Sequence, residues 1–364
     1  MKHAKSTSIL IAALTLVSCG GSSSSAPTTI GAESTVATTD SATTTGSSTT
    51  SASTTTVKSA STSTTIPTEP VMPLTGEAIE DPALAAHPAL VVKIDNHPDA
   101  RPQSGLNQAD IVFEENVEHL TRFAAVFQSM SPDPVGPIRS GRTQDVELLG
   151  LLNKPIFAWS GGNPGVTAAI DGSDFVVANV QTNARKASES YRSRDRAVPH
   201  NLYAQGSGLF TMAPQGATPP PQQFSYRTPD DIAAGDQSAG VELAMDGVNV
   251  RWTFDAKSGA YLRFQGGKAH NDAALGQVNA ANVVVLVVNY VPSKVDTKSP
   301  EAQTTGTGEV FAFSAGKVIH GKWTRPDRLT PFQLTADSGK PILLSPGRTW
   351  IELARVDSTT PTPA

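Results

Sequence analysis

Three apolar segments decide the fold of the first half of this chain: ALVVKI at 89–94, DIVFEEN at 110–116 and TRFAAVFQS at 121–129. They are rich in Val, Ile and Phe and are bounded by polar residues, Gly or Pro, which is typical of buried strands. Outward from them, the apolar spacing within 143–153 predicts a helix, and further elements follow: strands at 155–159 and 175–180 and a short helix at 166–170. Strands interleaved with helices predict an α/β (or α+β) domain over residues 72–212.

The chain beyond residue 240 has a different character. Gly-rich turns separate a series of short β-type segments, at 248–254, 260–265, 282–290, 309–314, 317–323 and 349–353. The wholly apolar run 283–288 is far shorter than the roughly 20 residues that a membrane-spanning helix needs. The sequence therefore predicts a mainly β domain over 241–357, preceded by a Pro-rich linker at 213–240 and followed by a tail at 358–364.

The first residues, 1–19, have the order of an export signal. Lys2 and Lys5 precede an apolar segment, and Leu16-Val-Ser-Cys19 closes it. This ending matches a lipobox, in which the cysteine receives diacylglycerol before signal peptidase cuts. We expect Cys19 to be the lipidated first residue of the mature chain, which places the protein at the cell membrane, lipid-anchored in the bilayer and facing the extracytoplasmic side. The alternative is an ordinary signal peptide with a chance cysteine.

Composition limits the remaining possibilities. Cys19 is the only cysteine in 364 residues, so once it carries lipid it leaves no thiol for a disulfide, a zinc–thiolate site or a nucleophile. Residues 20–71 are mainly Ser, Thr, Ala and Gly, which predicts a disordered tether. The net charge is -5 and no nucleic-acid motif is present, so nucleic acid is not an expected partner. No cofactor is expected either.

Several motifs together resemble the YerB-like lipoproteins, a bacterial family whose two domains are both of unknown function. In the first half the resemblance rests on 92–96 (VKIDN), 100–106, 109–115, 121–123, 135–142 and 199–203; in the second half it rests on 261–263, 270–272, 316–323 and 346–350. It implies a two-domain plan and an extracytoplasmic location but no settled activity. The family usually has a Gly pair in the turn before Thr121, whereas this chain has Glu118-His119-Leu120.

Arginines at the start of the helix predicted from Thr143 give the sharpest indication of a site. A helix N-terminus already carries about half a positive charge, so Arg139 and Arg142 are unfavourable there unless an anion joins them. Free backbone N–H groups beside Ser140, together with the arginines, would bind a carboxylate or phosphate. The alternative is an internal anion, Glu114 or Asp145. Both interpretations stay open.

Polar residues also follow the first predicted strand. Asp95 and Asn96 end it, and Arg101 and Gln103 lie in the Pro-bounded loop that follows. In open α/β sheets, ligands bind outside the carboxyl ends of the strands. The alternative is an Asx turn in which Arg101 pairs with Asp95.

Acidic and histidine side chains are candidates for acid–base chemistry. Strand alternation puts Glu114 and Glu118 on one face and Glu115 on the other, so a close carboxylate pair or merely solvated edge charges are both open. His200, beside an Arg-rich loop at 191–203, is a second candidate. The segment Pro199-His-Asn201 predicts the start of a helix.

Two functions follow from these residues. In the first, an Arg-rich cleft of the first domain binds an anionic cell-envelope ligand, peptidoglycan or a phosphorylated glycan, through Asn96, Arg101, Gln103, Glu118, Arg122, Arg139, Ser140, Arg142 and Asn201. In the second, a cell-wall-modifying hydrolase or transferase uses Glu114, Asp95 and His200 as acid and base. No spacing of ligands predicts a metal site. Binding is favoured because the arginines need an anion, whereas the carboxylates can be their partners; a purely structural or partner-docking lipoprotein is a third possibility.

Overall fold

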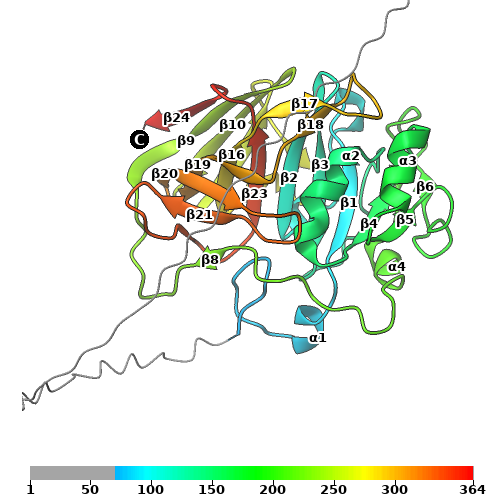
Figure 1. Ribbon diagram of the computed structural model, residues 1–364, viewed down its shortest axis with the longest axis horizontal. Helices are drawn as coiled ribbons and strands as arrows, with labels where there is room; N and C mark the ends of the chain where they lie inside the picture. Colours follow the sequence, from blue (N-terminus) through cyan, green and yellow to red (C-terminus); the bar gives the residue numbers. More distant parts are fainter. Residues whose placement is uncertain (1–69, 364) are drawn as a thin grey trace, which may run out of the picture. The chain divides into compact units, whose positions relative to one another are not determined.

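The computed structural model describes residues 70–363 (Figure 1). The three deciding segments form neighbouring strands, β1 (Leu90–Asp95), β2 (Ile111–Val117) and β3 (Leu120–Phe127), with β3 antiparallel to both others. All three are buried along nearly their whole length, as their apolar composition predicts. Residues 1–69, including Cys19 and most of the predicted tether, lie outside the described part of the chain.

Parallel strands and helices complete the first half. β4 (Ile156–Trp159) runs parallel to β1, and β5 (Val176–Asn179) runs parallel to β4. The helices α2 (Thr143–Leu148) and α3 (Pro164–Asp171) cover one face of these strands (Figure 1). The predicted helix at 143–153 continues beyond α2 as the 3₁₀ helix η3 (Leu149–Leu152). The predicted mixed α/β architecture is confirmed.

The second half is mainly β, as predicted. Its longer strands are β9 (Asp236–Met245), β10 (Val248–Asp255), β11 (Ala260–Gln265), β16 (Asn282–Val287), β19 (Gly306–Ser314), β20 (Lys317–Arg325) and β23 (Thr349–Ala354). β23 lies between β2 and β16 and runs parallel to both. A strand from the end of the chain thus joins the two halves in one sheet.

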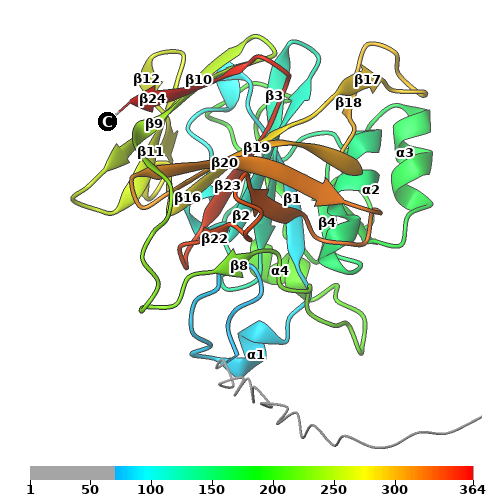
Figure 2. The same ribbon diagram turned by 60° about the vertical axis from the view of Figure 1, so that its left-hand side comes forward.

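Two apolar layers lie on opposite faces of this central sheet. On one face, Trp252 and Tyr261 of β10 and β11 pack in the same cluster as Ile94, Phe123 and Trp350. The other layer lies under α2, η3 and α3. Figure 2 shows β9, β10 and β11 on the opposite side of the view from α2 and α3.

Short elements connect these layers. They are α1 (Pro82–Ala85), η1 (Pro98–Ala100), η2 (Leu106–Gln108), β6 (Tyr191–Arg192), β7 (Leu202–Tyr203), α4 (Gly206–Phe210), β8 (Ser225–Tyr226), β12 (Lys268–Ala269), β13 (Asn271–Asp272), β14 (Gly276–Gln277), β15 (Asn279–Ala280), β17 (Tyr290–Pro292), β18 (Pro300–Ala302), β21 (Gln333–Ala336), β22 (Leu343–Leu344) and β24 (Thr359–Pro363). The segment expected as a linker, 213–240, thus contains β8 and the start of β9. The segment expected as a tail contains β24, which pairs with β9.

Two local features bear on the predictions from the sequence: the segment 199–201 and the turn between β2 and β3. The predicted helix start at 199–201 is wrong: these residues form a turn that leads into β7, and the next helix begins only at Gly206. In the β2–β3 turn, His119 has a φ of 54°, a left-handed conformation that glycine adopts more easily. Among residues 70–363, no helix is long and apolar enough to cross a membrane.

Candidate functional site

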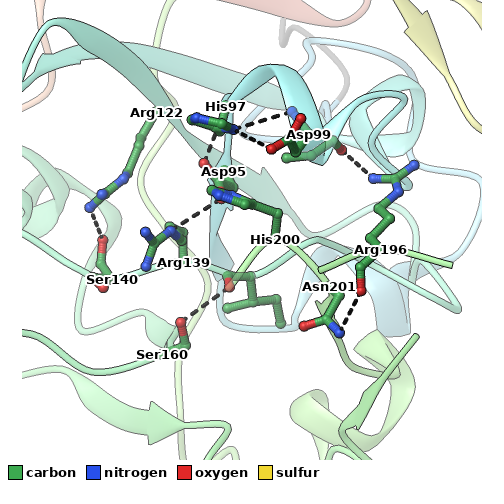
Figure 3. Close-up of polar contacts among 12 residues, drawn as sticks. Asp95, His97, Asp99, Arg122, Arg139, Ser140, Ser160, Arg196, His200 and Asn201 are labelled. Carbon is green, nitrogen blue, oxygen red and sulfur yellow. Dashed lines mark hydrogen bonds and ion pairs between the residues drawn. The ribbon is translucent and has the colours of Figure 1, made fainter. Parts of the chain in front are cut away.

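Polar side chains gather where β1 and β4 end and β3 begins (Figure 3). Asp95 is the last residue of β1 and lies opposite Arg122 in the strand register. The segment that carries Arg139 and Ser140 continues this edge, because the Arg139 backbone N–H donates to Lys93 and its carbonyl accepts from Ser160. We call Asp95, Glu118, Arg122, Arg139, Ser140, Arg142 and His200 the arginine edge. It lies at the carboxyl ends of parallel strands, where ligand sites of α/β sheets occur.

Two carboxylates of this edge pair with two of its arginines. Arg142 donates from Nε and Nη2 to the two carboxylate oxygens of Glu118, at 3.0 and 2.6 Å. Burial alone would raise the pKa of Glu118, but the hydrogen bonds from Arg142 and Ser299 lower it to about 2. Arg139 Nε lies 3.1 Å from Asp95 Oδ2. The internal anions are therefore Glu118 and Asp95.

Neither Asp145 nor Glu114, the two acids expected from the sequence, pairs with the side chains of Arg139 and Arg142. Asp145 accepts the backbone N–H of Arg142 at 2.6 Å and forms a wholly buried ion pair with Lys93, also at 2.6 Å. Lys93 lies 2.7 Å from Glu115 as well. The other named acid, Glu114, belongs to a separate interior network described below.

Arg122 differs from its two neighbours. Only 8% of this residue is exposed, and its one side-chain hydrogen bond within the described residues is from Nη1 to the Ser140 carbonyl, at 2.8 Å. No carboxylate of residues 70–363 lies within ion-pair distance of it. Burial, followed by repulsion from Arg142 and Arg139, lowers the pKa of Arg122 to about 10 despite the attraction of Asp95 and Glu118. With three arginines and two carboxylates, the edge keeps one positive charge that its own acids do not neutralise.

Asp95 also orients His200. Its Oδ2 lies 2.7 Å from His200 Nδ1, and its Oδ1 accepts the backbone N–H of His97 at 3.0 Å, the bond of an Asx turn. A carboxylate at Nδ1 fixes the proton there and leaves Nε2 as an acceptor. Arg101 does not pair with Asp95; its Nη2 donates to the Asn96 carbonyl at 2.9 Å.

Asn201 stabilises the neighbouring loop. It accepts from Arg192 Nη1 at 2.9 Å, and its Nδ2 donates to the carbonyls of Ser193 and Arg196 at 2.8 and 3.1 Å. Because only 5% of Asn201 is exposed, its polar atoms are used inside the protein. This side chain holds His200 in place rather than offering groups to a ligand.

The remaining sequence candidates belong to the interior. Asn96 Nδ2 donates to Thr121 and Gln265, and Gln103 Oε1 lies 2.8 Å from His270 Nε2. Glu114 is fully buried and accepts from Arg263 Nη2 at 2.6 Å. The side chains of Asn96, Gln103 and Glu114 thus lie in the interior, although Gln103 Nε2 also donates to the Asp95 carbonyl at 2.9 Å. Glu114 meets neither Asp95 nor His200 in an open space.

A second acid completes this interior group. Glu352 of β23 accepts from Trp252 Nε1 at 2.8 Å. Burial and then repulsion from Glu114 raise the pKa of Glu352 well above its usual value. We call Glu114, Arg263 and Glu352 the buried carboxyl centre: two carboxyl groups face one arginine, and the raised pKa of Glu352 favours a proton there, which would balance the charge.

Sequence reasoning missed two kinds of residue. On the edge, Ser160 and Gln181 follow β4 and β5, and Gln181 Nε2 donates to the Ser160 carbonyl at 3.1 Å. Polar residues directly after apolar strands were the available signal. In the interior, Glu352 stands alone as a charged residue in the apolar strand TWIELA, a pattern that predicts a buried partner.

Comparisons with known proteins agree with this architecture. Residues 74–218 match the family model described as "Protein of unknown function (DUF3048) N-terminal domain", and residues 241–351 match the corresponding C-terminal domain. The chain is 29% identical over 299 residues to "Putative lipoprotein YerB" of Bacillus subtilis (strain 168), covering 77% of this chain and 85% of that protein. It is also similar to the crystal structure of the YerB protein from Bacillus subtilis, with a TM-score of 0.69 and 25% identity over 81% of this chain and 100% of that one. The resemblance read from the motifs is confirmed, and the chain belongs to the DUF3048 family of YerB-like proteins.

Proposed function

We propose that this protein is a lipoprotein, held in the cell membrane by acylated Cys19, whose arginine edge binds an anionic cell-envelope ligand on the extracytoplasmic side. The lipobox at 16–19 and the name of the Bacillus subtilis relative support the anchor. The ligand chemistry is a carboxylate or phosphate group, as peptidoglycan stem peptides and phosphorylated glycans carry.

The state of Arg122 carries the ligand proposal. An arginine of which only 8% is exposed, crowded by two like charges, is unfavourable by itself. Its neighbours cannot relieve this, because Asp95 and Glu118 are engaged with Arg139 and Arg142. A bound anion would accept from the donors of Arg122 that the Ser140 carbonyl leaves unused, and charge-assisted bonds to arginine are among the stronger hydrogen bonds in proteins.

Enzymatic hydrolysis or transfer is the second candidate, and one observation favours it. The 2.7 Å contact between Asp95 and His200 orients an imidazole whose Nε2 is available as a base. The carboxylate that this chemistry was expected to use, Glu114, is instead paired with Arg263 in the interior. Binding therefore agrees better with the geometry.

Calorimetric titration with muropeptides, polymeric peptidoglycan and phosphorylated glycans tests the ligand proposal. The full-length Cys19→Ser chain avoids the lipid, and the ligand is recovered afterwards for product analysis. We expect saturable binding that Arg122→Gln weakens at least about tenfold, the effect of one charge-assisted hydrogen bond. Arg251→Gln is the matched control, because Arg251 lies on β10, stacked 4.4 Å from the Phe264 ring.

Each outcome separates the candidates. Equal loss in Arg122→Gln and Arg251→Gln, or no loss in either, contradicts the site. Cleaved ligand that depends on His200 makes the protein an enzyme. The anchor is tested separately by labelling cells with a fatty acid: Cys19→Ser should abolish both the label and the membrane association, and retention of both would refute the lipidation of Cys19.

A further inference from the structure

Three potential metal ligands converge at His200, a member of the arginine edge. His97, Asp99 and His200 each offer one ligand atom, and these atoms all lie within 4.8 Å of one another. His97 precedes the short helix η1, and His200 precedes β7, so they come from distant parts of the sequence. Figure 3 shows His97 and Asp99 side by side, next to Asp95 and His200.

One of the distances between these ligand atoms comes close to that of a tetrahedral metal site. His97 Nδ1 and Asp99 Oδ2 are 3.6 Å apart, and ligand bonds of about 2.0–2.1 Å to zinc imply an edge of about 3.3 Å between two tetrahedral ligands. The two imidazole rings are stacked with centroids 4.1 Å apart and planes 14° apart, so one ring must turn out of the stack before a nitrogen of each ring can point at one ion. The side chains of His97 and Asp99 have room for this movement, because they are 35% and 67% exposed.

The hydrogen bonds already present leave a lone pair free on His200, whereas they occupy Nδ1 of His97. Asp95 accepts from His200 Nδ1, which leaves Nε2 of His200 free to bind a metal. This is the carboxylate–histidine arrangement that orients metal ligands in many zinc proteins. His97 Nδ1 accepts the backbone N–H of Asp99 at 3.2 Å, so His97 must give up this bond to bind an ion through Nδ1.

We propose that His97, Asp99 and His200 bind one Zn²⁺ ion, with Asp95 as the residue that positions His200. Two imidazoles and one carboxylate suit zinc better than magnesium or calcium, which prefer oxygen ligands alone. Three protein ligands leave a fourth position for water or an anionic oxygen. The carboxylates of Asp99 and Asp95 offset the repulsion between the ion and Arg139, which is already paired with Asp95.

The zinc proposal does not depend on the proposed anion binding, because zinc binding is measured without any anionic ligand. Either proposal can therefore fail without the other. The full-length Cys19→Ser chain is again suitable, since it lacks the one thiol that would otherwise bind zinc. We expect one equivalent of Zn²⁺ to bind in calorimetry, and Co²⁺ to give the visible absorption of a tetrahedral site. His97→Ala and His200→Ala should each weaken binding at least about 100-fold, and Asp95→Asn about 10- to 100-fold.

His320 is the matched control. It also contacts two carboxylates, Glu309 at Nε2 and Asp337 at Nδ1, at 2.8 and 2.5 Å. These acids lie at opposite nitrogens of the ring and cannot converge on one ion, so His320→Ala should bind zinc like the parent chain. Circular dichroism of every variant verifies the fold. Absence of saturable binding by the parent, or unchanged affinity and Co²⁺ spectrum in the His97→Ala, His200→Ala double variant, would overturn the proposal.

Discussion

The arginine edge and the buried carboxyl centre solve opposite charge problems. In the centre, one arginine faces two carboxyl groups, all fully buried. At the edge, three arginines face two carboxylates, and part of the group is exposed. Both regions contain the same kinds of side chain, and they differ in which sign is in excess.

The difference lies in what can neutralise the excess. A surplus carboxyl group can take up a proton, and burial and repulsion from Glu114, which raise the pKa of Glu352, favour this solution in the interior. A surplus guanidinium has no comparable choice, because arginine keeps its proton at any pH a cell experiences. The interior therefore neutralises its own charge, whereas under the proposed function the edge takes up an anion from outside.

The largest expected effect comes from removing the arginine of the centre. Arg263→Leu leaves Glu114 without its partner and removes the hydrogen bonds from Nη1 to Gln265 and His270. We expect the free energy of unfolding to fall by about 3–5 kcal/mol, because a buried charge loses its counterion. Urea denaturation of the Cys19→Ser chain measures it. Arg251→Leu, on the exposed face of β10, should cost less than about 1 kcal/mol; an equally small loss for Arg263→Leu would mean that the centre contributes no stability.

A smaller effect, dependent on pH, should follow from Glu352→Gln. The pKa of Glu352 is raised in the folded protein, so its stabilising contribution is complete below about pH 4.5 and is lost as the pH rises through the folded value. Gln is neutral throughout and escapes this loss. We expect the variant to match the parent within about 1 kcal/mol at pH 5 and to gain at least about 1 kcal/mol relative to it at pH 8.

The comparison with the parent removes the contributions of other groups. Burial also raises the pKa of Glu115 to about 8 and that of Asp110 to about 6, and both contributions have the same sign in parent and variant. Glu114→Gln should instead lose stability at both pH values, because it removes the partner of Arg263. A relative loss by Glu352→Gln at pH 8 would show that Glu352 is an anion in the folded protein.

Much of this architecture could be predicted from local sequence. The contacts within the two charged regions could not, because their residues are distant from one another in the sequence. Apolar runs such as 89–94 and 121–129 are predicted as strands because they are short, apolar and bounded by polar or turn residues. Asp95 is expected at the edge of the sheet because it follows the first of these runs. The partner of Glu352 could not be found this way, because it depends on β23 lying between β2 and β16. The same limit hid the proximity of His97 to His200, and it hid the choice of Glu118 over Glu114 as the partner of Arg142.

The smallest expected effect on stability belongs to Arg122→Met. This variant tests directly whether the arginine edge differs from the buried carboxyl centre in its need for a ligand. If the edge is held for a ligand, the charge of Arg122 is a cost in the free protein, since burial and its arginine neighbours lower its pKa. Methionine keeps the buried apolar stem and loses only the bond to the Ser140 carbonyl. We expect the free energy of unfolding to stay unchanged or to rise by up to about 1 kcal/mol while anion binding is lost, the exchange of stability for function that binding sites show. Arg122→Lys, which keeps the charge, should stay close to the parent in stability and retain part of the binding. A loss of more than about 2 kcal/mol in Arg122→Met would instead make Arg122 a structural residue like Arg263, and the two regions would then differ only in exposure.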